Sequence, residues 1–208
     1  MQWQHPFTCA VAGPTKCGKT EWAKRFIANL ANLVTPRPEK IIFCFSEWQP
    51  SYEELNNVSG LEFCEGLPDI SELKRTQTQP KLVILDDLMH ECSKNQESTV
   101  LFTRGSHHWN VSVLNILQNL FYSGLRTSRI NCHYLVLLKC PSDQLQISTL
   151  ARQLYPRQQK YFLESYQDAC SQPYGYLVVD LTPESPDEFR LRTNIFPTEI
   201  GFAYLPKL

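Results

Sequence analysis

The residues at positions 13–20 have the types and the spacing of a phosphate-binding loop. The pattern G-x-x-x-x-G-K-[ST] is filled in order by Gly13, Pro14, Thr15, Lys16, Cys17, Gly18, Lys19 and Thr20. Glycines allow the backbone to curl so that successive N–H groups and a helix N-terminus point at one anion. Lys19 is then expected to reach the β- and γ-phosphates of bound ATP, and the Thr20 hydroxyl to ligate Mg²⁺.

Polar side chains also end two later apolar runs. Asp86 and Asp87 follow the run at 81–85. We expect Asp86 to hold Mg²⁺, directly or through water, and Asp87 to orient or deprotonate the attacking water. Gln118 follows the run at 111–117 and could sense the γ-phosphate or position water, because an amide both donates and accepts. A solvated turn for the acids and a polar strand cap for the glutamine stay open as alternatives.

Hydrolysis also needs a cation that neutralises charge on the transferred phosphoryl group. Arg104, Arg126 and Arg129 are candidates, and spacing alone does not select among them. They belong to a basic middle, since residues 101–160 hold seven Lys or Arg and one acid in a chain of formal net charge −1. Such a stretch favours a surface for the phosphates of nucleotide or nucleic acid, and solvated helix faces are the alternative.

The apolar pattern predicts strands that alternate with helices. Strands are expected at 7–12, 40–45, 61–64, 81–87, 111–117, 134–138, 176–180 and 189–193. Helices are expected at 21–33, 69–75, 97–105, 142–154 and 158–171. This order predicts an α/β fold whose mainly parallel sheet has helices on both faces and ends in a C-terminal strand pair. Because ligands of such sheets bind outside the carboxyl ends of the strands, the loop, Asp86, Asp87 and Gln118 should lie on one edge.

Composition is that of an ordinary globular protein, with 208 residues, 42% of them hydrophobic and 20% charged. We expect one domain over 1–208, with a core at about 5–155 and a C-terminal helix and strand extension at 156–208. No apolar run is long enough for a membrane span and the first residues do not read as a signal peptide, so an intracellular protein is expected. The eight cysteines lack zinc-site spacing and favour buried thiols, although Cys17 at a helix N-terminus predicts a lowered pKa.

Longer stretches of the sequence resemble a known family. They are GPTKCGKT, LVILDDLM, LFTRGSHHWNVSVLNILQNLF, RTSRINCHYLVLLKCPSDQLQISTLARQLYP, PYGYLVVDLTP and FRLRTNIF. Together they are similar to genome-packaging ATPases of the FtsK–HerA superfamily, closest to the branch found in Maverick/Polinton elements, adintoviruses and related eukaryotic double-stranded DNA viruses. The resemblance covers nearly the whole chain, and the block from TRGSHHWNVSV to QNLF is more specific than the phosphate loop.

The resemblance implies a RecA-like P-loop NTPase that assembles as a homo-oligomeric ring and uses ATP and Mg²⁺ to pump double-stranded DNA into a preformed capsid. Lys19, Asp87 and Gln118 would be catalytic, and Thr20 and Asp86 would hold the metal. Arg126, at the place of the family's arginine before an Asn-containing strand, becomes the first choice for a residue that acts across a subunit interface. Many members end the second motif in Asp-Glu, so Asp-Asp here leaves the catalytic base open.

The implied partners are DNA, bound through phosphates without sequence preference, and a portal or vertex component of the capsid. The implied place is an infected host cell, at the packaging vertex, with nucleus and cytoplasm both open. Two other functions remain at this point. One is a small-molecule phosphotransferase such as a nucleoside or nucleotide kinase, and the other is a HerA-like DNA helicase or translocase that is not tied to packaging.

Overall fold

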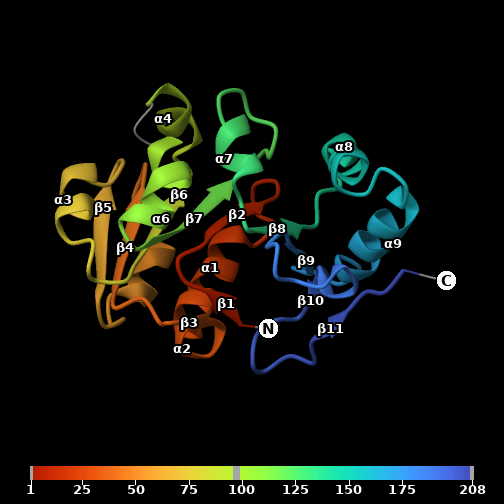
Figure 1. Ribbon diagram of the computed structural model, residues 1–208, viewed down its shortest axis with the longest axis horizontal. Coiled ribbons are helices and arrows are strands. Elements are labelled where there is room, and N and C mark those ends of the chain that lie inside the picture. Colours follow the sequence, from red (N-terminus) through yellow and green to blue (C-terminus); the bar gives the residue numbers. More distant parts are fainter. Residues whose placement is uncertain (1, 96–98, 207–208) are drawn as a thin grey trace.

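A computed structural model describes residues 2–95 and 99–206 and is built on one large sheet. In space its strands follow the order β11-β10-β9-β8-β2-β7-β6-β4-β5. Their bounds are β2 (Thr8–Ala12), β4 (Lys40–Phe45), β5 (Leu61–Glu65), β6 (Lys81–Asp86), β7 (Val111–Leu117), β8 (Tyr134–Leu138), β9 (Tyr176–Asp180), β10 (Leu191–Thr193) and β11 (Phe202–Ala203). Neighbours from β5 to β8 run parallel, and β9, β10 and β11 each run antiparallel to the strand before them (Figure 1).

Helices cover both faces of this sheet. One face carries α1 (Lys19–Ala28), α2 (Leu30–Leu33) and the 3-10 turn η1 (Pro50–Leu55). The other carries α3 (Ile70–Arg75), α4 (Met89–Lys94), the π-helical η2 (Leu101–Gly105), α6 (Ser106–His108), α8 (Gln144–Leu154) and α9 (Gln159–Ala169). The remaining elements are β1 (Trp3–Gln4) paired with β3 (Val34–Thr35), α7 (Arg126–Ile130) between β7 and β8, and the 3-10 turn η3 (Asp187–Phe189).

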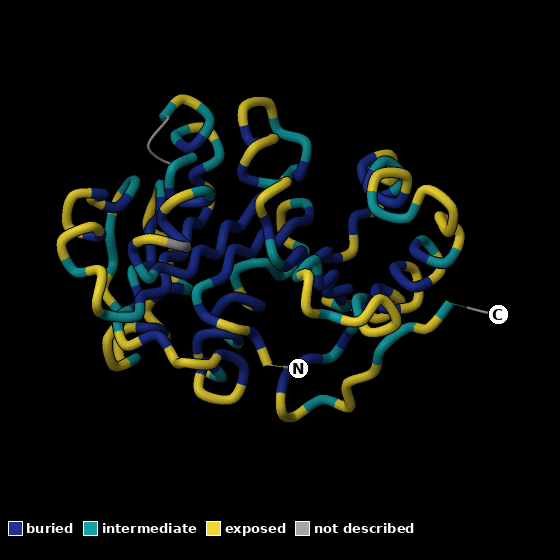
Figure 2. The backbone as a smooth tube through the Cα atoms, in the orientation of Figure 1, coloured by how far each residue is buried: buried dark blue, intermediate teal, exposed yellow. Residues whose placement is uncertain are grey.

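The strands are continuous apolar runs because both of their faces are buried. In β6, Leu82 and Ile84 pack into the cluster on the α1 side, whereas Val83 and Leu85 pack into the cluster on the other side. Figure 2 shows the result as a buried sheet inside a shell of more exposed helices and loops. Two hydrophobic layers therefore hold the sheet, one on each face.

The α/β class with a mainly parallel sheet, helices on both faces and C-terminal antiparallel strands is confirmed. Several elements differ from the sequence expectation. The helices α4 and α7, the turn η1 and the β1–β3 pair have no counterpart in it, and three expected segments are changed. The helix at 21–33 begins earlier, at Lys19, and is interrupted at Asn29, whose side-chain amide donates to the Arg25 carbonyl (2.8 Å). The helix at 97–105 has residues 97–98 outside the described part, and its described end is π-helical and runs on into α6. The C-terminal pair gains a third strand, β11.

Within the described residues, no helix combines the length and the apolar character needed to cross a bilayer. All cysteines are free thiols, and six of the eight are buried, as the expectation of buried thiols requires. The core thus contains small sulfur side chains as ordinary packing groups.

Candidate nucleotide-binding site

The phosphate loop joins β2 to α1, so the motif lies between a strand and a helix as its chemistry requires. Gly18 caps α1 with φ 98°, the left-handed region that glycine adopts at low cost. Gly13 donates its backbone N–H to the Leu117 carbonyl (3.2 Å), and a Cβ placed on it would lie 2.6 Å from Cys17 Sγ. The local geometry therefore demands glycine at position 18, whereas a larger residue at position 13 would require the Cys17 side chain to move.

The sheet order brings the ends of three strands together at this loop. β7 lies between β2 and β6, with Ala12 opposite Leu117 and Asp86 opposite Ile116. A cavity of about 330 Å³ opens at this edge, lined by Thr15, Lys16, Gly18, Lys19, Thr20, Glu21, Gln49, Asp86, Asp87, Ile116 and Gln118. The structure thus places the loop, both aspartates and the glutamine around one volume.

Asp86 lies beside Thr20 in the way a magnesium site needs. The Thr20 hydroxyl donates to Asp86 Oδ2 (3.0 Å), and Asp86 is 3% exposed. Burial raises the pKa of Asp86, while hydrogen bonds from Tyr52 and Thr20 act against that rise by favouring the carboxylate. A hydroxyl and a carboxylate suit Mg²⁺, which usually takes one or two protein oxygens together with substrate phosphates and water. These two residues fit the ion.

Asp87 and Gln118 form a second pair at the mouth of the cavity. Gln118 Nε2 donates to Asp87 Oδ1 (2.9 Å), and both side chains are exposed. Asp87 has φ 57°, a left-handed conformation that is uncommon outside glycine and is found at functional sites. The amide thus fixes one carboxylate oxygen and leaves the other available to accept a proton from water.

Lys19 and Cys17 complete the description of the loop. The Lys19 ammonium donates to the Pro14 carbonyl (2.8 Å), so it is held across the loop. The expected lowering of the pKa of Cys17 is wrong. Burial raises the pKa of this thiol and outweighs the opposing charge of Lys19. The helix N-terminus alone is therefore a poor guide to the thiol's reactivity.

Tyr52 is the residue that sequence reasoning missed. It lies on η1, is fully buried, and its hydroxyl donates to Asp86 Oδ2 (3.0 Å). Burial and the nearby carboxylate raise the pKa of Tyr52, so it remains a donor. The only local signal is Pro50 at the start of a helical turn, which says nothing about a contact with a residue 34 positions away.

None of the three candidate arginines lines the cavity of its own chain. Arg129 lies over the Phe121 ring, with 4.4 Å from Cζ to the ring centroid, and donates to Gln153 Oε1 (2.8 Å). Arg126 and Arg104 are exposed, on α7 and η2. In the described part of the chain, no hydrogen bond or ion pair of the Arg126 side chain is found. Arg129 is thus engaged within the chain, whereas Arg126 is available to a partner.

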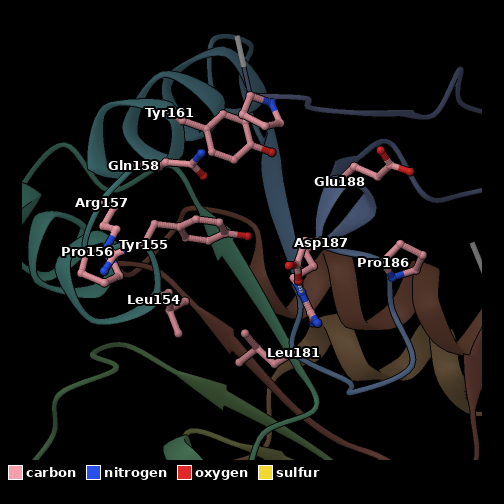
Figure 3. A pocket seen from close by; sticks show the side chains of 12 residues that line it. Leu154, Tyr155, Pro156, Arg157, Gln158, Tyr161, Leu181, Pro186, Asp187 and Glu188 are labelled. Carbon is pink, nitrogen blue, oxygen red and sulfur yellow. Dashed lines mark hydrogen bonds and ion pairs between the residues drawn. The ribbon is translucent and has the colours of Figure 1, made fainter. Parts of the chain in front are cut away.

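A larger hollow lies elsewhere, between α8, α9 and the C-terminal segment, with a volume of about 860 Å³ (Figure 3). Tyr155 and Tyr161 contribute aromatic walls, and Arg190, which also lines the hollow, is bound to Asp187 (2.7 Å). This hollow contains no phosphate loop and no paired acid and hydroxyl. Size therefore does not identify the site, and the smaller cavity holds the chemistry.

Searches with the sequence gave no match to a protein-family model or to a curated protein. The structure is similar to solved ATPases. The DNA-packaging ATPase B204 of Sulfolobus turreted icosahedral virus matches with a TM-score of 0.61 and 11% identity over 98% of this chain and 100% of that chain. The genome-packaging NTPase B204 of Sulfolobus turreted icosahedral virus 2, solved with ATP-gammaS, gives 0.59 and 10% over 97% and 98%. The cytoplasmic domain of the type VII secretion ATPase EccC of Thermomonospora curvata gives 0.59 and 13% over 86% of this chain and 24% of that chain.

At these identities the similarity shows the fold. The α/β architecture with its parallel sheet and C-terminal antiparallel strands matches that of these solved ATPases. The match covers nearly the full lengths of this chain and of B204, so it also includes the C-terminal antiparallel strands.

Proposed function

We propose that this protein hydrolyses ATP with Mg²⁺ in the cavity at the phosphate loop. One observation carries the proposal, namely the convergence of the loop, the Thr20–Asp86 contact and the Asp87–Gln118 pair around one volume. In this mechanism the loop N–H groups and Lys19 bind the phosphates. When bound, Mg²⁺ neutralises charge on the phosphate oxygens.

Asp87 is the group that accepts a proton from the attacking water or orients it. Gln118 holds that carboxylate through its amide, and its own carbonyl oxygen remains free to accept from the water. Asp86 is more deeply buried than Asp87, and Thr20 and Tyr52 hold one of its oxygens, which suits a fixed magnesium ligand better than a group that handles the attacking water. The difference in burial thus supports the role of metal ligand for Asp86 and that of proton acceptor for Asp87.

We further propose that hydrolysis drives double-stranded DNA into a viral or virus-like capsid. The fold shared with the B204 packaging ATPases supports this, as does the resemblance of the sequence motifs to those of Maverick-type elements and eukaryotic DNA viruses. The basic middle also supports it, because its cations lie mostly at the surface. The exposed ones are Arg104, Arg126, Lys139, Arg152, Arg157 and Lys160. Contacts with DNA phosphates would accept every sequence, as a translocating motor must.

Arg126 is proposed to complete the site of a neighbouring subunit in a homo-oligomeric ring. It begins α7, and Ile130, four residues later and therefore on the same helix face, is 59% exposed. Arg126 is exposed and has no hydrogen bond or ion pair among the described residues, so it is able to reach a neighbouring protein, and arginine is enriched at protein–protein interfaces. The Arg126 guanidinium of one subunit would then contact the transferred phosphoryl group that is bound in the neighbouring subunit.

The decisive experiment measures ATP hydrolysis with and without double-stranded DNA, across protein concentration and salt. We expect stimulation by DNA that rises cooperatively with protein concentration and weakens as salt increases. Turnover that ignores DNA and responds to a nucleoside would replace the motor with a kinase. A translocase not tied to packaging would show the same stimulation but no binding to a capsid vertex.

A mixing experiment tests the shared site. Arg126→Ala should bind ATP normally and lose turnover, and so should Asp87→Ala. A mixture of the two proteins should regain part of the activity, because some interfaces then combine an intact acid with an intact arginine. Normal turnover by Arg126→Ala, or no recovery on mixing, would contradict the role of Arg126, and Arg104 would be tested next.

A further inference from the structure

Tyr174 is an exposed aromatic residue that lies directly against the phosphate loop. A Cβ placed on Gly18 would lie 2.8 Å from Cδ1 of the Tyr174 ring, so the ring packs on the backbone of that glycine. The residue is nonetheless 70% exposed. One edge of the ring therefore touches the loop while much of its surface faces solvent beside the cavity that Gly18 lines.

The sheet order shows which part of a nucleotide would reach this ring. Asp86, Asp87 and Gln118 end β6 and β7, which lie on one side of β2. β8 and β9 lie on the other side, and Tyr174 comes just before β9. A triphosphate whose terminal group lies at the acids and the glutamine, and whose chain crosses the loop, therefore points its other end toward Tyr174.

The turn that carries Tyr174 is tightly built. Tyr174 has φ 62°, a conformation that is rare for a bulky side chain. Gly175 follows, and a Cβ placed there would lie 2.3 Å from the Ala169 carbonyl oxygen, while its N–H donates to the Gln172 carbonyl (3.1 Å). The turn thus fixes the position of the Tyr174 backbone beside the loop, although asparagine or glycine would adopt this conformation more easily.

Trp48 is the other exposed aromatic residue near the cavity, and it makes a poorer platform. It is 46% exposed and precedes Gln49, which lines the cavity. Its ring packs edge-on against Phe63 (5.0 Å between centroids) and Phe45 (5.5 Å), beyond the end of β4. That position is on the side of the acids, where the terminal phosphate is expected. Trp48 therefore serves as the matched control.

We propose that Tyr174 is the platform on which the base of the bound nucleotide stacks. The inference rests on the proposed nucleotide function and adds a recognition element to it: the site binds a nucleoside triphosphate more tightly than the triphosphate chain alone. Stacking uses the face of the ring, so any base can be accepted and the phenol hydroxyl is not needed.

The test compares the dissociation constants of ATP and of inorganic tripolyphosphate, both with Mg²⁺, by calorimetry. Tyr174→Ala should weaken ATP binding about five- to hundredfold, the range for loss of one stacked base, and leave tripolyphosphate binding unchanged. Tyr174→Phe should keep the wild-type affinity for both ligands. Trp48→Ala should keep the wild-type ratio of the two constants.

A spectroscopic readout tests the same contact independently of affinity. The chain has four tryptophans of its own, so the readout is the difference from wild type. In Tyr174→Trp, ATP should change the tryptophan emission more than it does in the wild-type protein, and tripolyphosphate should add no such change. The assignment would be overturned if the ratio of the ATP and tripolyphosphate dissociation constants stayed unchanged in Tyr174→Ala, or changed in Trp48→Ala instead. The proposed function would survive either result as long as the wild-type protein binds ATP. If the wild-type protein bound neither ligand, the proposed function itself would fail and this inference with it.

Discussion

The two ends of the parallel sheet both carry buried polar side chains, yet they use them differently. At the amino end, His5 is hydrogen-bonded to Ser112 Oγ (2.6 Å) and Asn110 Oδ1 (2.8 Å). Lys81 is 1% exposed and donates to backbone carbonyls in the 76–79 turn. These groups satisfy one another within the chain, which removes the cost of burying them.

At the carboxyl end, the hydrogen bonds leave carboxylate oxygens able to accept further bonds. Asp86 is bonded on one oxygen by Thr20 and Tyr52, and Asp87 on one oxygen by Gln118, around a cavity of about 330 Å³. The comparison teaches that buried polarity alone does not mark a site. A site arises where spare acceptors and loop N–H groups face a volume that a ligand can fill.

The largest contrast is expected between the two lysines of these ends. Lys19→Ala should lower ATP hydrolysis at least about a hundredfold, because the phosphates lose their main cation in a preorganised site. The melting temperature of the Lys19→Ala variant should change little, since the Lys19 side chain bonds a single loop carbonyl. Turnover assays and thermal melts measure both quantities.

Lys81→Met is the matched variant at the amino end. It should cost about 1–3 kcal/mol of stability, since two carbonyls lose their donor, and each kcal/mol corresponds to about 2–4 °C in a domain of this size. Activity per folded molecule should stay at the wild-type level. If Lys81→Met lost activity while remaining folded, the division between the two ends would be wrong.

The next effect concerns the proton acceptor. Asp87→Asn keeps the shape of the side chain and its contact with Gln118 but removes the basic oxygen, so turnover should fall about 10²- to 10⁴-fold with ATP binding retained. Asp187→Asn, in the large C-terminal hollow, should leave turnover unchanged. Equal losses in both variants would indicate general damage to the fold and would remove Asp87 from the chemistry.

A smaller effect is expected from Tyr52→Phe. The variant keeps the ring that packs on Phe43 (4.9 Å) and loses the hydroxyl that orients Asp86. Residues that orient a metal ligand commonly contribute about tenfold or more to metal affinity, so the Mg²⁺ concentration for half-maximal turnover should rise by about that factor. Tyr176→Phe removes a similar bond to Glu199 (2.7 Å) away from the site, and it should leave the Mg²⁺ dependence unchanged.

The sequence predicts the local features well because their causes are local. Gly18 and its strand and helix neighbours follow from a contiguous pattern, and Asp86, Asp87 and Gln118 follow from where apolar runs end. The contact of Tyr52 with Asp86 could not be predicted, because it depends on how η1 docks on the sheet. The lateral order β2-β7-β6 also differs from chain order.

Three further features were not predicted from the sequence, two of them for local reasons. The side chain of Asn29 bonds back to the Arg25 carbonyl and breaks a helix that the apolar spacing favours. α7 is only Arg126–Ile130, too short for a periodic signal to show, so the sequence placed Arg126 near a strand end without a helix. The position of Tyr174 against Gly18 is likewise a tertiary contact between segments far apart in the chain.

The smallest expected effect is the contribution of His5, at the amino end of the sheet, to the pH dependence of folding stability. Burial lowers the pKa of His5, and the charge of Lys81 acts in the same direction. The folded protein therefore keeps His5 neutral at a pH where the unfolded chain, with a pKa of about 6.5, already takes up a proton. His5 thus favours the folded state fully above that pH, and the contribution declines as pH falls from there to the lower folded pKa.

Denaturant unfolding between pH 7.5 and 5.5 measures this decline, which cannot exceed about 1.4 kcal/mol per pH unit for one proton. His5→Gln should be less stable than wild type at pH 7.5, because both ring hydrogen bonds are lost, and should lose less stability on acidification. His108→Gln, at an exposed histidine, should follow the wild-type curve. If the stability of His5→Gln fell as steeply on acidification as that of wild type, burial of His5 near Lys81 would not exclude the proton. The two ends of the sheet would then differ less than their hydrogen bonds imply.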